Sequence, residues 1–348
     1  MTVEWWEYLA VFAASGTLCA VFTPHVVRFA VSRNLLDQPG GHKSHDTAVP
    51  YLGGVAIVVA FAVSLVIVAL FKSSHNATGE LAIVMGLAVF LSMVGLIDDL
   101  RHVSVLWRVI AEVVSGVVLW LLGSGVTVTG IQVLDLGLTV LWIVGITNAF
   151  NLLDNMDGLA AGLAAISSLT IFAVAVSSGQ FLVAALAMGL AGCTVGFLRH
   201  NFHPARVYMG DGGSLFIGFV VGYLCIKLRI DSGGSVNVLI PVLACSAPIF
   251  DTSLVTVSRL VAGLSPFQGG RDHVSHRIVR LGLTVPVAVT TIYLAATGIG
   301  ILVFVISTTD PTSAWLLIGT IGVTLAIVGG FLLTVPVYSD GPDGRLSN

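Results

Sequence analysis

Long apolar segments, separated by short polar ones, dominate the chain. Eleven segments are apolar over nearly all of their length, and a hydrocarbon layer about 30 Å thick requires roughly 20 such residues in a helix. They cover residues 6–31, 50–71, 80–97, 105–122, 136–153, 158–177, 181–199, 213–230, 236–260, 285–307 and 313–335. Because only helices satisfy their own backbone in lipid over such lengths, the pattern predicts an all-α, polytopic integral membrane protein with about eleven transmembrane helices.

The apolar segments follow one another without a long linker, a low-complexity tract or a visible internal repeat. We therefore expect a single transmembrane domain over residues 1–335 and a short tail over residues 336–348. The first apolar segment begins within "MTVEWWEYLAVF", which contains no basic residue. We interpret it as a membrane span rather than a cleaved signal peptide.

The cationic residues are distributed unequally between the two sides that these spans define. Lys72, Lys227 and Arg229 fall on one side, which leaves twelve of the 15 for the other. Those twelve are Arg28, Arg33, Lys43, Arg101, Arg108, Arg199, Arg206, Arg259, Arg271, Arg277, Arg280 and Arg345. Because cation-rich loops stay in the cytoplasm, the distribution predicts an outside N-terminus and a cytoplasmic C-terminus.

The composition agrees with a membrane protein and limits the classes of partner that we expect. Hydrophobic residues make up 56% of the chain and charged residues 9%, whereas soluble domains carry about 25% charged residues. The net charge of −3 gives no reason to expect a nucleic-acid partner. The four cysteines lie in apolar stretches without CxxC spacing, so we expect small core residues rather than disulfides or metal ligands.

Polar residues gather in the five loops that we predict to be cytoplasmic. The third loop, "NAFNLLDNMDGLAAG" at residues 148–162, is the most conspicuous. The other four are "NLLDQPGGHKSHDTAVPYLGG", "LIDDLRHVS", "RHNFHPARVYMGDGGS" and "RLVAGLSPFQGGRDHVSHRIVRLG", and together the loops hold seven of the nine histidines. Because ionisable residues at membrane depth are costly, this one-sided concentration predicts an active site that faces the cytosol.

Each polar group also has a purely structural interpretation. Asp154 with Asp157, or Asp211 alone, could stabilise the start of a following helix, where acids favour the positive end of the dipole. The histidines could be ordinary interfacial residues. Asp98 and Asp99 are different, because two acids at the C-terminal end of a helix oppose its dipole.

Taken together, the loops carry the groups that phosphate chemistry requires. Asp154 and Asp157, three residues apart, would share one face of a helical turn. Oxygen ligands suit Mg²⁺, which keeps several waters and bridges substrate phosphates. Basic side chains could hold those phosphates, and the candidates are Lys43, Arg101, Arg108, Arg206, Arg271 and Arg277. The combination predicts phosphoryl transfer on an anionic, nucleotide-like substrate.

Five motifs, in order along residues 35–284, resemble those of the polyprenyl-phosphate N-acetylhexosamine-1-phosphate transferases. They are "LLDQPGGHKSHDTAVPYLGG", "IDD", "NAFNLLDNMDGLAAG", "NFHPARVYMGDGGSLFIG" and "SPFQGGRDHVSHRIVRLG". The resemblance implies transfer of a sugar-1-phosphate from a UDP-sugar to a polyprenyl phosphate with release of UMP. It also implies Mg²⁺ as the cofactor, with Mn²⁺ as a substitute.

The resemblance implies roles for individual residues. Asp98 and Asp99 match the paired acids near the lipid phosphate, and Asp211 matches a metal-binding aspartate. These three are our candidate catalytic residues, and Asp211 and Asn151 are the candidate metal ligands. The candidate residues for binding substrate or cofactor are Lys43, Asn148, Asn151, Asp154, Asp157, Asn201, Arg271, His273 and His276.

The last loop indicates a branch of the family. It lacks the contiguous histidine triplet of the peptidoglycan-precursor enzymes and resembles the branch that uses UDP-N-acetylglucosamine (UDP-GlcNAc). Ser275 stands where close relatives often carry a middle histidine, which argues against phosphate binding at that position. We therefore expect GlcNAc-1-phosphate transfer as the first membrane step of a cell-envelope glycan, such as lipopolysaccharide or teichoic acid. Two alternatives stay open: a phospho-N-acetylmuramoyl-pentapeptide transferase and, in a different class, a secondary transporter.

The implied reaction is attack of a lipid phosphate oxygen on the β-phosphorus of the UDP-sugar. A phosphomonoester has a second pKa of about 6 and is mostly dianionic at pH 7, so a general base is not obligatory and the role of Asp98 or Asp99 as one stays open. We expect a multi-pass protein of the inner (plasma) membrane with its site on the cytoplasmic side. The expected partners are the UDP-sugar, the polyprenyl phosphate and the lipid bilayer, and a homodimer is an open alternative to a single chain.

Overall fold

The computed structural model describes residues 4–37, 49–72, 75–101, 103–229, 235–266, 269–340 and 346–347. These residues are overwhelmingly helical, which confirms the all-α prediction. The strands are two antiparallel pairs of two residues each, β1 (Leu36–Asp37) with β2 (Val49–Pro50) and β3 (Ser339–Asp340) with β4 (Leu346–Ser347). The helices are α1 (Trp5–Ser32), α2 (Gly53–Lys72), α3 (His75–Arg101), α4 (Val105–Leu121), α5 (Gln132–Leu153), α6 (Leu159–Ser177), α7 (Phe181–Asn201), α8 (Asp211–Lys227), η1 (Ser235–Val238, a 3₁₀ turn), α9 (Leu239–Ala244), α10 (Ser246–Val261), α11 (Val274–Arg280), α12 (Val285–Thr308) and α13 (Pro311–Leu333).

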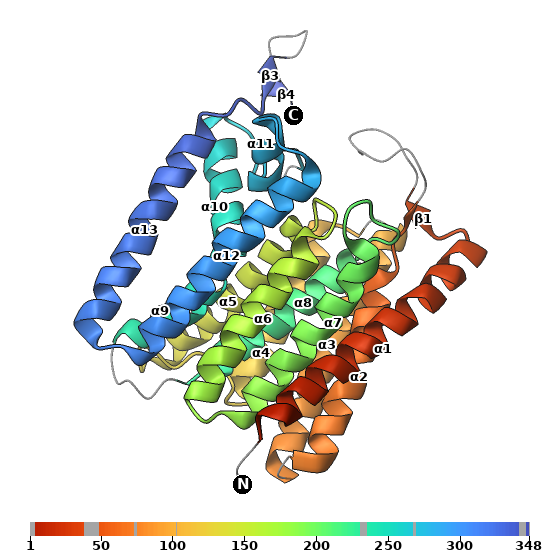
Figure 1. The fold of residues 1–348 in the computed structure, drawn as a ribbon, viewed down its shortest axis with the longest axis vertical. Helices are drawn as coiled ribbons and strands as arrows, with labels where there is room; N and C mark the ends of the chain where they lie inside the picture. The colour runs from red at the N-terminus through yellow and green to blue at the C-terminus, as the bar shows by residue number, and fades with distance from the viewer. Residues whose placement is uncertain are drawn as a thin grey trace. The chain divides into compact units, whose positions relative to one another are not determined.

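The chain divides into two compact units, Met1–Asp231 and Ser232–Asn348. The first unit contains α1 to α8, which run side by side as a bundle (Figure 1). The second contains η1 and α9 to α13, with α12 packed against α9, α10, α11 and α13. The single domain over residues 1–335 stays a prediction.

Helix α8 is the centre of the first unit. It packs against α2, α3, α5, α6 and α7, and every residue from Gly212 to Cys225 is buried. The sequence permits this because α8 carries no charge between Asp211 and Lys227. The other helices therefore surround α8, and its N-terminus is fixed on several sides.

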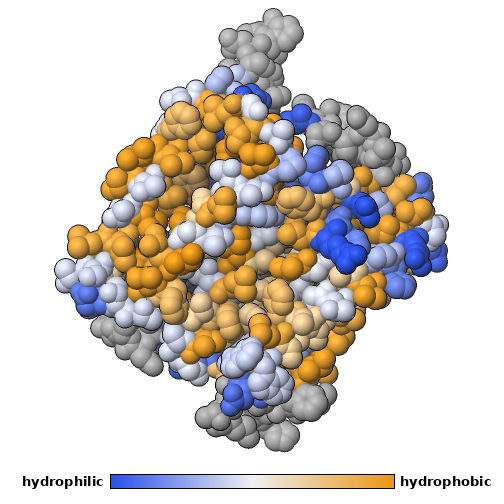
Figure 2. Space-filling model, in the orientation of Figure 1, coloured by the Kyte–Doolittle hydropathy of each residue, from blue (hydrophilic) through white to orange (hydrophobic). Residues whose placement is uncertain are grey.

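Seven helices among the described residues are long and apolar enough to cross a membrane, or eight if α9 and α10 form one bent span. Each of the eleven predicted segments overlaps a helix, but α4 and α8 have only 17 residues each. Hydrophobic residues cover most of the face shown in Figure 2, and hydrophilic residues form small groups between them. The structure thus confirms a multi-pass membrane protein, while the number eleven and the orientation stay predictions.

The apolar segment predicted over residues 236–260 contains a sharp bend. Its two halves, Val236–Ala244 and Ser246–Val261, meet at 78° around Cys245. Pro248 is consistent with the position of the bend, because proline has no N–H to donate one turn back and fits best in the first turn of a helix. The second half therefore begins as a new helix at Ser246.

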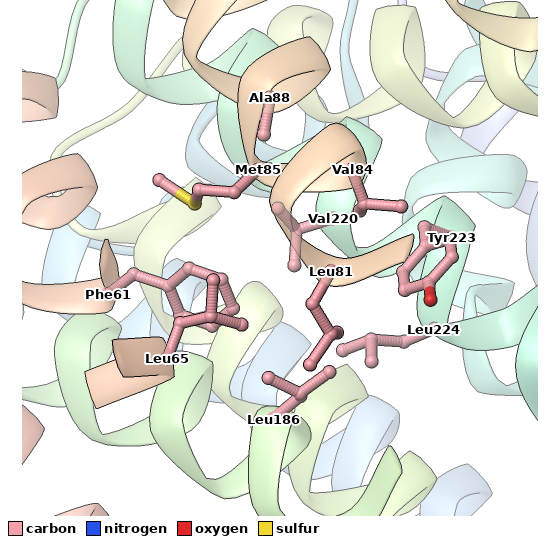
Figure 3. A pocket seen from close by; sticks show the side chains of 10 residues that line it. All are labelled: Phe61, Leu65, Leu81, Val84, Met85, Ala88, Leu186, Val220, Tyr223 and Leu224. Atoms are coloured by element: carbon pink, nitrogen blue, oxygen red, sulfur yellow. The ribbon is translucent and has the colours of Figure 1, made fainter. Parts of the chain in front are cut away.

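A small cavity inside the first unit lies among α2, α3, α7 and α8. Its lining is apolar apart from the hydroxyl of Tyr223 (Figure 3). That hydroxyl donates to Glu80 at 2.9 Å. Because the wall offers no charged group, this cavity is a packing defect of the bundle and not the site of the chemistry predicted above.

Candidate active site

Glycines let two helices, α2 and α3, come close to the N-terminus of α8. A Cβ at Gly95 of α3 would lie 2.4 Å from the carbonyl carbon of Asp211, and one at Gly54 of α2 would lie 2.4 Å from the Cα of Gly213. Gly210, which precedes α8, has φ +72° and approaches Asp99 so closely that its own Cβ would lie 2.6 Å from a carboxylate oxygen. Larger residues would push α2 and α3 away, so these glycines set the geometry of the site.

Asp99 caps α8 from a different helix. One of its carboxylate oxygens accepts from the backbone N–H of Asp211 at 3.0 Å, and the other accepts from that of Gly212 at 3.3 Å. These N–H groups have no partner inside α8, and the positive end of the helix dipole favours the carboxylate. The carboxylate of Asp99, which opposes the dipole of α3, is thus compensated by the dipole of α8.

Asp98 and Asp211 are joined by one arginine. The Nη1 atom of Arg108, in α4, donates to Asp98 at 2.7 Å and to Asp211 at 2.5 Å. Asp98 also accepts from the backbone N–H of Val103 at 2.6 Å. The side chains of Arg108 and Asp98 are mostly buried, whereas that of Asp211 is 31% exposed. Asp211 therefore keeps access to solvent.

Asn151 completes this group from α5. Its Nδ2 donates to Asp211 at 2.9 Å and to the hydroxyl of Ser214 at 3.0 Å. The end of α3, the start of α4 and the end of α5 thus meet at Asp211, which lies at least 60 residues further along the chain. We call Asp98, Asp99, Arg108, Asn151 and Asp211 the acid cluster.

A second polar contact lies one helical turn further along α4 and α5. Asn148 donates to Glu112 at 2.5 Å and to the carbonyl of Val144 at 2.9 Å. Glu112 is completely buried, and its Oε1 atom has no hydrogen-bond partner. Asn148 and Glu112 therefore form a contact between α5 and α4, and Asn148 is not a member of the acid cluster.

The acids of the third loop do not start α6, nor do they share a helical face. Residues 154–157 form a turn, and α6 begins at Leu159 after Gly158, whose φ is +79°. The helical i, i+3 geometry that we predicted for Asp154 and Asp157 is therefore wrong, because a left-handed glycine ends the turn before the helix starts. Gly210, and not Asp211, is likewise the residue that precedes α8.

Asp154 lies in a strongly acidic environment. Its burial, and then repulsion from Asp211 and Asp99, raise its pKa to about 7, although the Gly210 N–H donates to it. A carboxyl that is hard to ionise beside two others indicates a local excess of negative charge. Such a place attracts a cation.

Asp157 and Asn201 hold two loops together. Asp157 accepts from the ring of His203 at 2.8 Å and from the N–H of Ala205 at 3.0 Å. Asn201 is buried, accepts from the N–H of Gly158 at 3.1 Å and donates to the carbonyl of Val207 at 2.9 Å. Both side chains therefore support the loops on either side of α6 and α7.

An apolar groove begins next to the acid cluster, between α3 and α4. It is lined by Phe90, Val94, Ile97, Val103, Trp107, Ile110, Ala111 and Val114. Ile97 and Trp107 directly precede Asp98 and Arg108, and the other lining residues of the two helices follow at spacings of three, four and seven. The groove thus extends from the charged groups about two helical turns, roughly 10 Å, along the hydrophobic part of the bundle.

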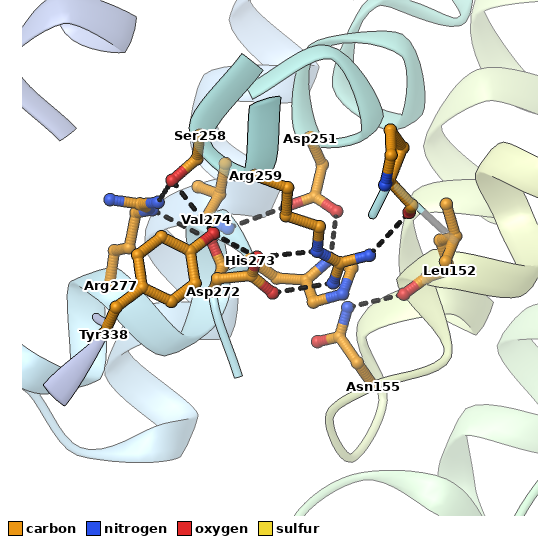
Figure 4. Close-up of polar contacts among 11 residues, drawn as sticks. Leu152, Asn155, Asp251, Ser258, Arg259, Asp272, His273, Val274, Arg277 and Tyr338 are labelled. Carbon is orange, nitrogen blue, oxygen red and sulfur yellow. Dashed lines mark hydrogen bonds and ion pairs between the residues drawn. The ribbon is translucent and has the colours of Figure 1, made fainter. Parts of the chain in front are cut away.

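The second unit contains a different charged network, formed by Arg259, Asp272, Arg277 and Tyr338 (Figure 4). Arg259 makes two hydrogen bonds to the carboxylate of Asp272, at 2.8 and 2.7 Å. Tyr338 donates to the same carboxylate at 2.7 Å. Burial alone would raise the pKa of Asp272, but these partners hold it below the usual range.

Arg277 is fully buried in this network and cannot hold a substrate phosphate as predicted. It donates to the backbone carbonyls of Asp272, Leu332 and Val335 and to the hydroxyl of Ser258. Its charge is used to connect α11 to the segment that follows α13. The sequence pattern misled us because an arginine at a loop edge looks the same whether it faces inward or outward.

The histidines of the last loop stand at the start of α11. His273 is buried, and its Nδ1 atom lies 2.7 Å from Asp251, which also accepts from the N–H of Val274 at 2.7 Å. Burial, together with the nearby charges of His273 and Arg271, lowers the pKa of His276 to about 4. His276 is therefore neutral at pH 7 and can act there only as a neutral hydrogen-bonding group.

The structure brings together some of the predicted site residues and not others. Asp98, Asp99, Asn151 and Asp211 meet in the first unit, with Asp154 close enough to be repelled by two of them. Lys43 lies outside the described residues. Arg108 was predicted only as one of six phosphate-binding candidates, and no sequence signal singled it out.

Comparisons with known proteins agree with this geometry. The family model for glycosyl transferase family 4 matches residues 80–229, which contain the whole acid cluster. The chain is 34% identical over 294 residues to a probable undecaprenyl-phosphate N-acetylglucosaminyl 1-phosphate transferase of Bacillus subtilis, covering 81% of this chain and 80% of that one.

Two further relatives are informative. A decaprenyl-phosphate N-acetylglucosaminephosphotransferase of Mycolicibacterium smegmatis is 30% identical over 97% of this chain and 90% of its own. A phospho-N-acetylmuramoyl-pentapeptide-transferase of Moorella thermoacetica is 38% identical, over only 55% of this chain and 65% of its own. The chain belongs to glycosyl transferase family 4 and is an enzyme of the glycosyl-1-phosphate transferase class, as its motifs predicted, and not a secondary transporter.

Proposed function

We propose that this enzyme transfers GlcNAc-1-phosphate from UDP-GlcNAc to a polyprenyl phosphate, with UMP and polyprenyl-diphosphate-GlcNAc as products. The observation that carries the proposal is the convergence of Asp98, Asn151 and Asp211 from distant segments on one point. The names of the relatives from Bacillus subtilis and Mycolicibacterium smegmatis support the sugar and the class of lipid.

The bonds that change are few. An oxygen of the lipid phosphate attacks the β-phosphorus of UDP-GlcNAc, and the bond from that phosphorus to the bridging oxygen breaks. The leaving group is UMP, and the bond between the sugar and its phosphate is untouched. Catalysis of such a step depends mainly on positioning and on stabilising the negative charge of the phosphates.

The acid cluster fits a divalent cation. Its donors are hard oxygens, Asp211 is partly exposed, and Asp154 lies close enough to Asp99 and Asp211 for the three carboxylates to repel one another. In the described part of the chain, no group of three or more His, Cys, Asp or Glu side chains is arranged to hold a metal ion. Mg²⁺ does not require such a group, because it binds through one or two carboxylates and completes its coordination shell with water and substrate phosphates.

We assign Asp211 and Asn151 to the cation, which when bound would neutralise the diphosphate. Mn²⁺ would serve in the same place. Asp99 orients the N-terminus of α8, and Asp98 holds Arg108 in place while no cation is bound. Both acids thus act by positioning. If Asp98→Asn loses as much activity at high pH, where the lipid phosphate is fully dianionic, as at pH 7, proton abstraction by Asp98 is excluded.

The apolar groove between α3 and α4 suits the part of the polyprenyl chain nearest its phosphate. We assign the remaining candidates in the loops either to contacts with the substrate or to support of those loops, and they are Lys43, Asp157, Asn201, Arg271, His273 and His276. Asn148 supports the site by joining α5 to α4. We place the site on the cytoplasmic side of an inner (plasma) membrane crossed by eleven helices, where UDP-sugars are available. This orientation agrees with the distribution of arginines and lysines.

A single assay tests the proposal. Purified enzyme in detergent is given a polyprenyl phosphate, Mg²⁺ and radiolabelled UDP-GlcNAc, UDP-N-acetylgalactosamine or UDP-N-acetylmuramoyl-pentapeptide in parallel. We expect label in an organic-soluble product only with UDP-GlcNAc, and none after EDTA. Product from the muramoyl substrate alone would assign the protein to peptidoglycan synthesis, and product from the epimer alone would change the sugar.

A further inference from the structure

We propose that Arg108 is an internal counter-ion with two resting places. Without a divalent cation it holds Asp98 and Asp211 together, and when the cation binds it turns to Glu112. The inference rests on the divalent cation of the proposed function and deepens it, because it states how the protein stays folded before the cation arrives.

The first resting place is visible. A single nitrogen, Nη1 of Arg108, bonds both Asp98 and Asp211, at 2.7 and 2.5 Å. Asp99 lies beside them, held by the N–H groups at the start of α8. Three carboxylates at one helix end repel one another strongly in a partly buried place, so one guanidinium between two of them supplies the missing positive charge.

The second resting place is indicated by an oxygen without a partner. Glu112 lies four residues after Arg108 on the same face of α4, a spacing at which oppositely charged side chains meet. Its Oε2 atom accepts from Asn148, while its Oε1 atom is buried with no partner. An unpaired carboxylate oxygen at such a depth is costly and requires an explanation.

The two observations explain each other. A cation on Asp211 would compete with Arg108 for the same carboxylate, since the two positive charges repel. Glu112 then offers the displaced guanidinium an acceptor one turn away, still within α4. The Oε1 atom of Glu112 is therefore the acceptor that Arg108 uses only in the cation-bound state. Binding of the cation and the position of the Arg108 side chain are thus coupled.

The test measures Mn²⁺ binding and thermal unfolding without any substrate. Purified wild type, Arg108→Gln and Glu112→Gln are titrated with Mn²⁺, and free Mn²⁺ is measured by electron paramagnetic resonance. Unfolding is followed by tryptophan fluorescence with EDTA and with saturating Mn²⁺. Arg199→Gln is the matched control, because it makes the same charge change at an exposed position of α7.

We expect opposite effects from the two variants. Arg108→Gln should bind Mn²⁺ about tenfold more tightly, because no guanidinium has to leave, and should melt lower than wild type in EDTA but not in Mn²⁺. Glu112→Gln should bind Mn²⁺ about tenfold more weakly and melt like wild type in EDTA. Arg199→Gln should match the wild type throughout.

Weaker or unchanged Mn²⁺ binding by Arg108→Gln, or unchanged binding by Glu112→Gln, would overturn the inference. If Arg108→Gln does not fold, Arg108→Lys replaces it, because a lysine keeps the charge but is too short to join both acids and should also bind Mn²⁺ more tightly. Absence of Mn²⁺ binding by the wild type would overturn the inference too. The radiolabel assay is independent of these measurements, so failure of the proposed function is recognised separately.

Discussion

The acid cluster of the first unit and the arginine network of the second are built from the same residue types in opposite ways. Arg259, Asp272 and Arg277 are at most 1% exposed. Two side chains of the acid cluster, Arg108 and Asp211, are 16% and 31% exposed. The comparison separates charged side chains whose partners all belong to the fold from charged side chains that a ligand can still reach.

The difference lies in the number of fixed partners. In the second unit, Arg277 bonds three backbone carbonyls and a hydroxyl, and Arg259 meets a carboxylate with two parallel bonds. In the first unit, one nitrogen of Arg108 serves two acids, and a third acid depends on a helix dipole. Closed networks hold structure, whereas networks with excess charge bind ions.

The largest effect on stability should come from breaking the closed network. Arg259→Leu leaves the carboxylate of Asp272 buried without its main partner, which costs about 3–5 kcal/mol of unfolding free energy. Chemical unfolding in detergent should show this loss. Arg271→Leu, next to Asp272 in sequence but less buried, should change stability far less. Equal losses in the two variants would remove the distinction between the networks.

The largest effect on activity alone should come from the acid cluster. Asp211→Asn keeps the shape of the side chain but removes the charge that we assign to the cation, so we expect kcat to fall roughly 10²–10³-fold, comparable to other lost electrostatic contacts at transition states. The melting temperature should not fall, because repulsion with Asp98 and Asp99 is relieved. A matching loss of stability would mean that this cluster is structural as well.

An intermediate effect on stability and substrate binding is expected from Asn201, whose side chain joins the loop before α6 to the loop before α8. Asn201→Leu leaves the Gly158 N–H and the Val207 carbonyl without partners, which costs about 1–3 kcal/mol. We expect KM for UDP-GlcNAc to rise more than kcat falls, because the loops on both sides of the acid cluster are loosened. Steady-state kinetics measure this, and an unchanged KM would separate these loops from nucleotide binding.

The smallest effect concerns pH. Because burial lowers the pKa of His276 to about 4, its unfolded form binds a proton at higher pH than its folded form. Stability from this group is therefore complete above about pH 6.5 and is lost as the pH falls towards about 4. His276→Asn should reduce the acid-induced drop in melting temperature between pH 7 and pH 5 by a few degrees. A drop as large as that of the wild type would contradict this assignment.

Local patterns in the sequence predicted a large part of this protein. The apolar segments located every long helix, because the length of an apolar segment depends only on residues that are neighbours in the sequence. The motifs that contain Asp98, Asp99, Asn151 and Asp211 identified the family and these four members of the acid cluster. The bend at Cys245 was missed, although Pro248 marked where a new helix could begin.

The sequence pattern could not distinguish charged side chains that face the protein interior from those that face a ligand site. Arg108 and Arg277 both stand near the ends of apolar segments, yet one joins two acids of the candidate site and the other is enclosed by carbonyls. The sequence predicts a helical face at Asp154 and Asp157, whereas the structure has a turn there. That turn ends at Gly158, which has a positive φ and donates its N–H to Asn201, 43 residues further along the chain.

The sequence by itself determined the class of protein, its helices, its family and the residue types of its chemistry, since each follows from composition and spacing along the chain. Only the tertiary structure decided which charges meet. Asp99 caps α8 and Arg108 bridges Asp98 and Asp211, across separations of more than 100 residues between α8 and the other two helices. Such contacts depend on how closely glycines let helices approach, a property of the packed bundle and not of any one segment.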